Sequence, residues 1–194
     1  MPSEFTRHDL GSAPENSKPL LKQLLANSGP NGFYAVTAES PETLKAYAAL
    51  HQAFMATSFT DAEKTVVWQT VNVENECHFC VPAHSSMAKA MKIDDAVSDA
   101  LRDETPLPTA KLEALRDFVL LMMRNDGNVS DAQIAVFLDA GYTRRNMLEV
   151  VLGLAQKTIS NYVNHLARMG PDKQYQQYAW TKAGRREDGA GKLS

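Results

Sequence analysis

The stretch Glu76-Cys77-His78-Phe79-Cys80-Val81-Pro82-Ala83-His84 contains both cysteines of the chain. Its proline limits where a helix can begin, because a proline deep inside a helix removes a hydrogen bond and clashes with the preceding turn. The helix that carries residues 83–91 is therefore predicted to begin between Cys77 and Val81. The cysteine pair then lies in or just before the first turn of that helix, after a turn over residues 75–79.

The position of the cysteines favours an ionised thiol. A helix start presents unpaired backbone N–H groups and the positive end of the helix dipole, and both should lower the pKa of a cysteine below its free value of about 8.5. His84 follows Cys80 by four residues, which places the two side chains on one face of the helix. A neutral imidazole there could accept the thiol proton, and an imidazolium could hold the thiolate. With Cys77 close enough for a disulfide across the loop, the segment combines a nucleophile, a resolving thiol and a base.

Two other interpretations of the cysteine pair remain open at this point. The cysteines could be buried and inert. Alternatively, the pair and His84 could bind zinc together with His165. Structural zinc sites usually show a second ligand pair at a recognisable spacing, and the sequence has no second cysteine pair. The redox interpretation is therefore favoured over metal binding.

Sequence patterns on both sides of this stretch predict an all-α fold. Thr60-Asp61-Ala62-Glu63 and Ser130-Asp131-Ala132-Gln133 are capping boxes, which satisfy backbone donors at a helix start. Residues 65–73 are rich in β-branched side chains, but the preceding cap and the helical neighbours predict a helix there too. The remaining predicted helices cover residues 20–26, residues 41 to at least 54, residues 108–124, and residues 143–169. The last of these carries apolar side chains at Met147, Val150, Val151, Leu154, Ile159, Tyr162 and Leu166.

Length and composition suit one globular domain with extended arms. The chain has 194 residues, 44% of them hydrophobic, which is enough for a core without disulfides or metals as supports. Its formal net charge of -3 argues against nucleic-acid binding. No apolar run approaches the roughly 20 residues that span a bilayer. The polar N-terminus lacks the pattern of a signal peptide, so a cytoplasmic location is expected.

The predicted organisation has three parts. Residues 1–17 form an N-terminal arm, in which prolines and a glycine break any helix. Residues 18–170 form the helical domain. Residues 171–194 form a C-terminal arm and tail, which is expected to lie over the core or a neighbouring subunit. Its large anchors are Tyr175, Tyr178 and Trp180.

Residues 63–88 resemble the AhpD-like, carboxymuconolactone decarboxylase superfamily. The resemblance rests on the pattern Cys77-x-x-Cys80-x-x-x-His84, preceded by a capped helix and followed by a helix of small residues. A looser resemblance extends over residues 17–180. Ala13-Pro14, Ser40-Pro41 and the run Asn161-Tyr162-x-Asn164-His165 are similar to the uncharacterised peroxidase-related branch. The resemblance implies an all-α, AhpD-like helical bundle that forms dimers, trimers or hexamers.

The resemblance also implies roles for the three matching residues. Cys80 would attack a hydroperoxide and become a sulfenic acid. Cys77 would donate a proton and then resolve the sulfenic acid to a disulfide, while His84 would relay protons. The decarboxylase branch lacks the cysteine pair, so the presence of the pair argues against lactone decarboxylation.

Two positions depart from the family pattern. The family has a histidine immediately before the second cysteine, where this chain has Phe79, and His78 lies one position earlier. The alkylhydroperoxidase relay uses a glutamate twelve residues before the first cysteine, where this chain has Thr65. Glu76 and Glu63 are candidate substitutes, although Glu63 is more simply explained by its capping box. Asn161 and His165, which sit at helical spacing, could face the site or form a buried, hydrogen-bonded structural pair.

The expected activity is that of a thiol-dependent alkylhydroperoxidase or disulfide reductase. Its predicted catalytic residues are Cys77, Cys80, His84 and Glu76. The substrate would be a hydroperoxide or a disulfide, the reductant an external thiol, and no cofactor is implied. The alternatives are a cysteine-independent decarboxylase or isomerase of small oxo-acids, with His84 as general base, and a zinc-binding or redox-sensing protein.

Overall fold

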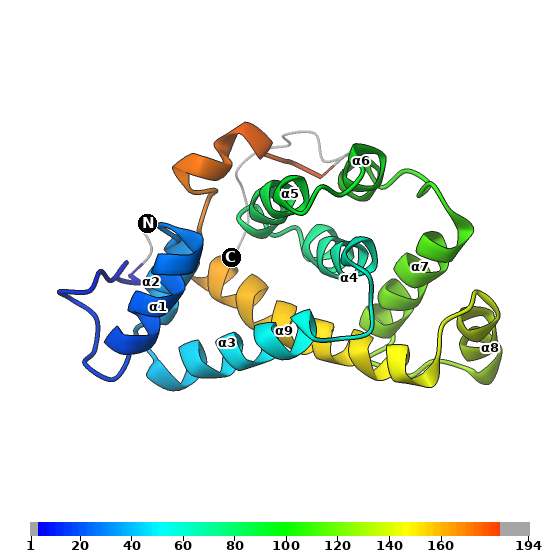
Figure 1. Cartoon of the computed structure of the whole chain (residues 1–194), viewed down its shortest axis with the longest axis horizontal. Helices are drawn as coiled ribbons and strands as arrows, with labels where there is room; N and C mark the ends of the chain where they lie inside the picture. The colour runs from blue at the N-terminus through cyan, green and yellow to red at the C-terminus, as the bar shows by residue number, and fades with distance from the viewer. Residues whose placement is uncertain (1–3, 183–194) are drawn as a thin grey trace, which may run out of the picture.

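The computed structural model describes residues 4–182, and this part of the chain folds into helices joined by short connections (Figure 1). It contains no strand, so the predicted all-α fold is confirmed. None of its helices is both long and apolar enough to cross a membrane. The helices are α1 (Lys18–Ser28), α2 (Gly32–Thr37), α3 (Pro41–Met55), α4 (Asp61–Glu74), α5 (Cys80–Ala90), α6 (Asp95–Asp103), α7 (Ala110–Arg124), α8 (Asp131–Asp139), α9 (Arg144–Leu166) and the 3-10 helix η1 (Lys173–Tyr178).

Helix α4 lies at the centre of the fold and is buried on every side. Helices α5, α6, α7 and α9 pack around it, and every residue from Glu63 to Val73 is buried. A helix surrounded in this way lacks the usual polar face, which explains why its sequence resembles a strand by composition. The predicted capping box begins the helix: the Thr60 hydroxyl accepts from the backbone N–H of Glu63, whose carboxylate accepts from the backbone N–H of Thr60.

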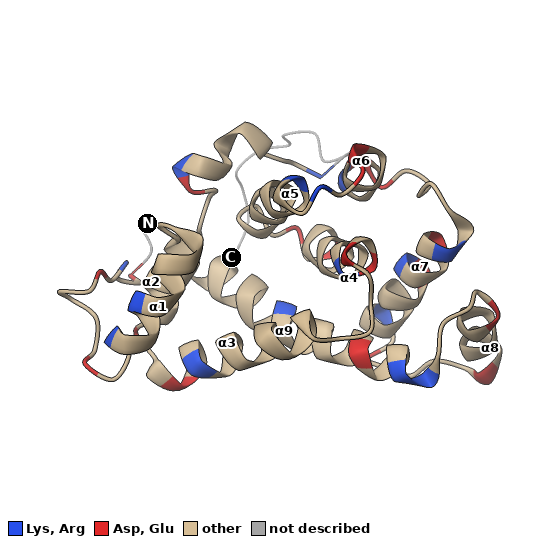
Figure 2. Cartoon of the chain, in the orientation of Figure 1, with Lys and Arg blue, Asp and Glu red and all other residues tan. Residues whose placement is uncertain are grey.

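Helix α9 runs alongside α3 and across α4 (Figure 1). Gly153 permits the close approach, because a Cβ atom at this position would lie 2.7 Å from the side chains of Phe54 and Val67. The buried face of α9 is mostly polar. In Figure 2, the charged residues of α9 lie in its first turns, except for Lys157 farther along. The buried polar residues of this face are Asn146, Glu149, Gln156, Lys157, Ser160, Asn161 and Asn164.

The apolar residues expected along α9 divide between its two faces. Val150 is fully buried, whereas Val151, Tyr162 and Leu166 are exposed together with Leu148. An apolar pattern alone does not reveal which face contacts the neighbouring helices, because polar side chains that bond to one another can also occupy an interior. The helix therefore turns a polar stripe inward and leaves much of its apolar stripe outside.

Two helices were not expected from the sequence. Helix α2 is only six residues long, too short to show a periodic pattern. The side chain of Asn31 begins it by accepting from the backbone N–H groups of Phe33 and Tyr34. Helix α6 begins in a similar way at Asp94, whose side chain accepts from the N–H of Ala96. Both are short segments fixed by a cap and by packing against their neighbours.

Both arms lie against the helical domain in the part that the structure describes. In the N-terminal arm, Ala13 is buried and the backbone N–H of His8 donates to the carbonyl of Ala35. In the C-terminal arm, η1 packs on α5, and the indole N–H of Trp180 donates to the carbonyl of Arg102 at 2.8 Å. The division into arm, domain and tail stays a prediction, and the tail from residue 183 onward lies outside the described residues.

Candidate active site

The two cysteines lie at the turn that joins α4 to α5. Glu76 occupies a left-handed conformation in this turn, with φ at 51°. The sulfur of Cys77 then accepts a hydrogen bond from the backbone N–H of Cys80 at 3.3 Å. The backbone carbonyl of Cys77 accepts a second one from the N–H of Val81. Cys77 therefore accepts hydrogen bonds from the first residues of α5. The helix begins at Cys80, within the range predicted from the position of Pro82. Both cysteines are reduced and buried.

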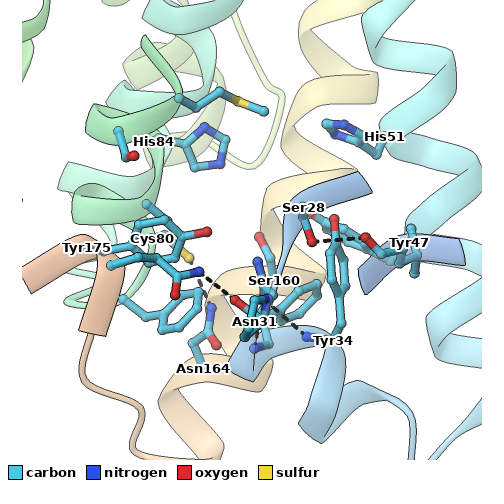
Figure 3. Close-up of a pocket in the computed structure, with 18 of the residues that line it drawn as sticks. Ser28, Asn31, Tyr34, Tyr47, His51, Cys80, His84, Ser160, Asn164 and Tyr175 are labelled. Carbon is cyan, nitrogen blue, oxygen red and sulfur yellow. Dashed lines mark hydrogen bonds between the residues drawn. The ribbon is translucent and has the colours of Figure 1, made fainter. Parts of the chain in front are cut away.

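The sulfur of Cys80 lies among hydrogen-bond donors. The side-chain amides of Asn161 and Asn164, both on α9, each donate to it at 3.1 Å. Figure 3 shows Asn164 beside Cys80 at the edge of a cavity. Cys80 is only 3% exposed, so water barely competes for these bonds. Donors aimed at a sulfur stabilise its charged form more than its neutral form.

A chain of amides fixes the orientation of Asn161. Its own amide nitrogen donates to Asn72 Oδ1 at 3.0 Å as well as to Cys80, so both of its N–H groups are used. Its oxygen accepts from Asn75 Nδ2 at 2.9 Å. Asn72 in turn donates to Gln69 Oε1 at 2.9 Å. These bonds leave Asn161 one orientation, in which a donor points at the sulfur.

A buried lysine lies on the other side of the site. Lys157 of α9 is 1% exposed, and its Nζ is 2.9 Å from Nε2 of His84. The ring of Trp68 lies near the rings of both histidines, with its centroid 5.1 Å from that of His84 and 5.9 Å from that of His51. His51 Nδ1 is 3.0 Å from the amide nitrogen of Gln156. The site therefore holds a buried amino group and two partly buried imidazoles.

These surroundings separate the pKa values of the two cysteines. Burial alone would raise the pKa of Cys80, but the hydrogen bond from the Cys77 thiol and the charge of Lys157 outweigh it. With the two asparagine amides, they lower the pKa of Cys80 to about 6. The pKa of Cys77 is raised, because its proton is held by Cys80 and because it is buried. At neutral pH, Cys80 is thus a thiolate and Cys77 a thiol.

The partner of His84 differs from the one expected. Within residues 4–182, His84 makes no hydrogen bond to Cys80 and bonds to Lys157 instead. Burial and the charge of Lys157 hold the pKa of His84 well below its usual value, so the imidazole is neutral. The sequence suggests an imidazolium of His84 as a cation that could hold the thiolate. In the structure this cation is the ammonium of Lys157. Burial lowers the pKa of Lys157, and its interaction with the cysteine pair, chiefly with Cys80, opposes this effect.

A cavity of about 700 Å³ lies in front of Cys80. Figure 3 shows Cys80 and His84 on one side of it and Tyr47 and His51 across from them. Cys77 is not part of the lining, so only one of the two cysteines borders the cavity. Apolar atoms make up most of the wall surface, and about half of the lining residues are aromatic or apolar: Leu24, Pro30, Phe33, Tyr34, Tyr47, Phe79, Ala83, Met87, Ala90 and Tyr175.

Comparison with known proteins identifies this architecture. No protein-family model and no curated protein matches the sequence. A solved structure of an alkylhydroperoxidase AhpD core, an uncharacterized peroxidase-related protein from Ralstonia eutropha JMP134, matches with a TM-score of 0.79 and 19% identity, over 89% of this chain and 94% of that one. An uncharacterized peroxidase-related protein from Silicibacter sp. TM1040 matches with a TM-score of 0.73 and 22% identity, over 90% of this chain and 95% of that one. The chain has an AhpD-like fold.

The AhpD-like fold brings three of the four predicted catalytic residues together. Cys77, Cys80 and His84 share the start of α5 and the turn before it. Glu76 is half-buried in that turn and does not line the cavity. Its proposed part in a proton relay therefore stays a prediction.

Other residues considered from the sequence lie away from the sulfur. Glu63 caps α4 and forms an ion pair with Lys111 at 3.2 Å. Thr65, in place of the family glutamate, donates its hydroxyl hydrogen to the carbonyl of Asp61 one turn earlier. His165 is exposed. The zinc alternative is not supported, because no three His, Cys, Asp or Glu side chains in the described ranges lie together as ligands.

Two site residues were missed by sequence reasoning. Lys157 and Asn164 lie 77 and 84 positions after Cys80 in the chain, and no local pattern links them to it. One signal was present: Lys157, Asn161 and Asn164 recur at helical spacing within the long helix predicted over residues 143–169. A polar stripe of this kind on a long helix indicates either a solvated face or a site, and here it lines the site.

Proposed function

We propose that the protein is a thiol-dependent peroxidase that reduces organic hydroperoxides through Cys80. The observation that carries this proposal is the sulfur of Cys80 itself. It faces a largely apolar cavity and receives two amide hydrogen bonds at 3.1 Å near a buried lysine. A thiolate with a lowered pKa is the species that attacks peroxides. An apolar wall suits the organic part of a hydroperoxide.

The first step transfers one oxygen atom to the sulfur. The Cys80 thiolate attacks the terminal oxygen of the hydroperoxide, so that an S–O bond forms and the O–O bond breaks. The sulfur is oxidised to a sulfenic acid, and the organic oxygen leaves as an alkoxide that takes up a proton. No metal or cofactor enters this step.

The second step uses Cys77. Its sulfur lies beside Cys80, where it accepts the Cys80 backbone N–H, and it stays protonated at neutral pH because its pKa is raised. Attack of Cys77 on the sulfenic acid forms the disulfide and releases water, which carries away the Cys77 proton. An external dithiol then reduces the disulfide by thiol–disulfide exchange.

Burial of Cys80 favours a hydroperoxide over a protein disulfide as the first substrate. A sulfur that is 3% exposed can meet a small molecule in the cavity, whereas a partner disulfide would have to enter it. The cysteine-independent decarboxylase or isomerase is not favoured. Nε2 of His84 already receives a hydrogen bond from Lys157, which makes the imidazole a weak general base.

The test is a titration of free thiols with an organic hydroperoxide. The wild-type protein should lose two thiols for each hydroperoxide consumed and should turn over when a dithiol is supplied. Cys80→Ser should consume none. Cys77→Ser should consume one equivalent, accumulate a sulfenic acid on Cys80 that a diketone reagent traps, and then stop. Turnover retained in Cys80→Ser would reject the proposal.

A further inference from the structure

The two ring nitrogens of His84 have different surroundings. Nε2 lies 2.9 Å from the Lys157 Nζ, whereas Nδ1 has no hydrogen-bond partner within residues 4–182. An ammonium can only donate, so Nε2 is the acceptor. Because the imidazole is neutral, its single proton then sits on Nδ1. His84 therefore presents an unused N–H donor, and it lines the same cavity as Cys80.

The charges around Lys157 change when Cys80 reacts. Lys157 has no carboxylate partner within residues 4–182, and the groups that raise its pKa are the two cysteines. The imidazole of His51, across from the site, is neutral because burial and then the charge of Lys157 lower its pKa. Conversion of the thiolate to a sulfenic acid removes the negative charge that, within residues 4–182, offsets the Lys157 ammonium. A buried ammonium without a counter-charge is costly, so the lysine is then driven to give up a proton.

Resting on the proposed function, we propose that Lys157 and His84 form a proton relay that protonates the leaving alkoxide. His84 is the catalytic residue of the pair, because it lines the cavity where the alkoxide forms and its Nδ1–H is not used by another group within residues 4–182. Lys157 is the positioning residue behind it, which holds the tautomer and resupplies the proton. This relay uses a lysine from α9 where the family resemblance would place a glutamate, at the position of Thr65.

The atoms and charges of this step balance. The alkoxide takes the proton from His84 Nδ1, and Nε2 takes a proton from Lys157, which becomes a neutral amine. Thiolate, ammonium and hydroperoxide thereby become sulfenic acid, amine and alcohol, and no net charge is left in the buried site. When a dithiol later reduces the Cys77–Cys80 disulfide, its two protons return to Cys77 and Lys157. The resting state is then restored.

The relay also predicts which substrates depend on it. An alkyl hydroperoxide leaves as a strongly basic alkoxide and needs the proton. A peracid leaves as a weakly basic carboxylate and does not. The two classes of oxidant therefore separate proton supply from thiolate reactivity in one protein.

The experiment follows the rate of Cys80 oxidation by tert-butyl hydroperoxide and by peracetic acid. Lys157→Arg keeps the positive charge but cannot supply a proton, because a guanidinium stays protonated in proteins. General acid catalysis contributes about 100-fold or more, so this variant should lose about 100-fold with tert-butyl hydroperoxide. Its rate with peracetic acid should stay close to that of the wild type. Lys64→Met, which removes a buried lysine on α4 that pairs with Asp61, is the matched control and should change neither rate.

Lys157→Met provides a second variant in case arginine does not fit. It should react slowly with both oxidants at neutral pH, because the thiolate loses its cation. At a pH high enough to ionise Cys80, its rate with peracetic acid should recover and its rate with tert-butyl hydroperoxide should not. Equal recovery with both oxidants, or an unimpaired Lys157→Arg, would overturn the relay and leave the peroxidase intact. A wild-type Cys80 inert to both oxidants would instead reject the proposed function.

Discussion

Helices α4 and α9 cross at the centre of the molecule and differ in which side chains they bury and which they expose. Helix α4 is buried all round and contributes Val66, Val67, Trp68 and Val71 to the apolar core, while its other buried residues include polar ones such as Gln69. Helix α9 turns a polar stripe inward and exposes apolar side chains such as Leu148, which is 72% exposed. Burial of apolar surface stabilises a fold, whereas buried polar groups are tolerated only when they are paired. We infer that α4 carries stability and that the C-terminal half of α9 carries chemistry.

The largest change in the free energy of unfolding should follow from substitutions in the apolar core contributed by α4. Trp68 is almost fully buried, packs against the tilted ring of Phe54, and donates its indole N–H to Gln156 at 2.8 Å. Trp68→Ala should lower the free energy of unfolding by about 3–5 kcal/mol, measured by urea denaturation. Trp68→Phe keeps most of the packing and should cost about 1–3 kcal/mol through the unpaired Gln156 oxygen. Equal losses in the two variants would show that the hydrogen bond, not the packing, dominates at this crossing.

The contact between the two helices can be tested at Gly153. A methyl group there meets Phe54 and Val67 at 2.7 Å, closer than carbon atoms approach without displacement. Gly153→Ala should therefore destabilise the fold by about 1–3 kcal/mol in the same measurement. Gly170→Ala is the control, because nothing lies within 4 Å of an added Cβ atom there. A neutral Gly153→Ala would mean that α9 can move away from α4 without cost.

The polar side of the comparison is tested through the pH dependence of thiol alkylation. The folded-state pKa of Cys80 is lowered to about 6, so its alkylation rate should be constant above that pH and fall as the pH drops below it. Asn164→Leu removes one amide donor and should move the midpoint upward by about one pH unit, since one such hydrogen bond to a charged group is worth about 1.5–3 kcal/mol. Asn27→Leu, which changes an exposed residue of the cavity wall, is the control. An unchanged midpoint in Asn164→Leu would remove this asparagine from the thiolate site.

The smallest change in the free energy of unfolding should follow from substitutions on the exposed face of α9. Leu148→Glu replaces an exposed apolar side chain and should change the free energy of unfolding by no more than about 0.5 kcal/mol. A larger loss would show that this face is covered by another molecule in solution. Sedimentation of both proteins would then test the predicted homo-oligomer, which remains a prediction.

The sequence predicts well those features that depend on near neighbours. The capping boxes at Thr60 and Ser130 are confirmed because both partners lie within four residues. The start of α5 follows from Pro82 and the cysteine pair in the same way. The helix over residues 65–73 is also confirmed, although its composition favours a strand, because its cap outweighs propensity.

The site beyond the cysteine pair could not be predicted, because it depends on contacts between distant segments. The spacing of Cys80 and His84 correctly places them on one helix, but it does not reveal that Lys157 bonds to the imidazole. The sequence indicated that Asn161 could face the site, but it did not predict the hydrogen bond from its amide to the sulfur of Cys80. His165, grouped with it by spacing, is exposed instead. Side-chain spacing shows which residues share a face of a helix. Whether that face contacts another helix, a cavity or solvent depends on how the helices pack.

The distance along the chain between Cys80 and its hydrogen-bond donors has a consequence for the protein during synthesis. Asn161 and Asn164 follow the sulfur by 81 and 84 residues. At about 5–20 residues per second, the cysteine is made on the order of ten seconds before those donors. Until α9 docks, its sulfur is an ordinary thiol, of which about a few per cent is ionised at pH 7. We therefore expect a growing chain to resist oxidation at this sulfur until α9 has been made and has folded into place.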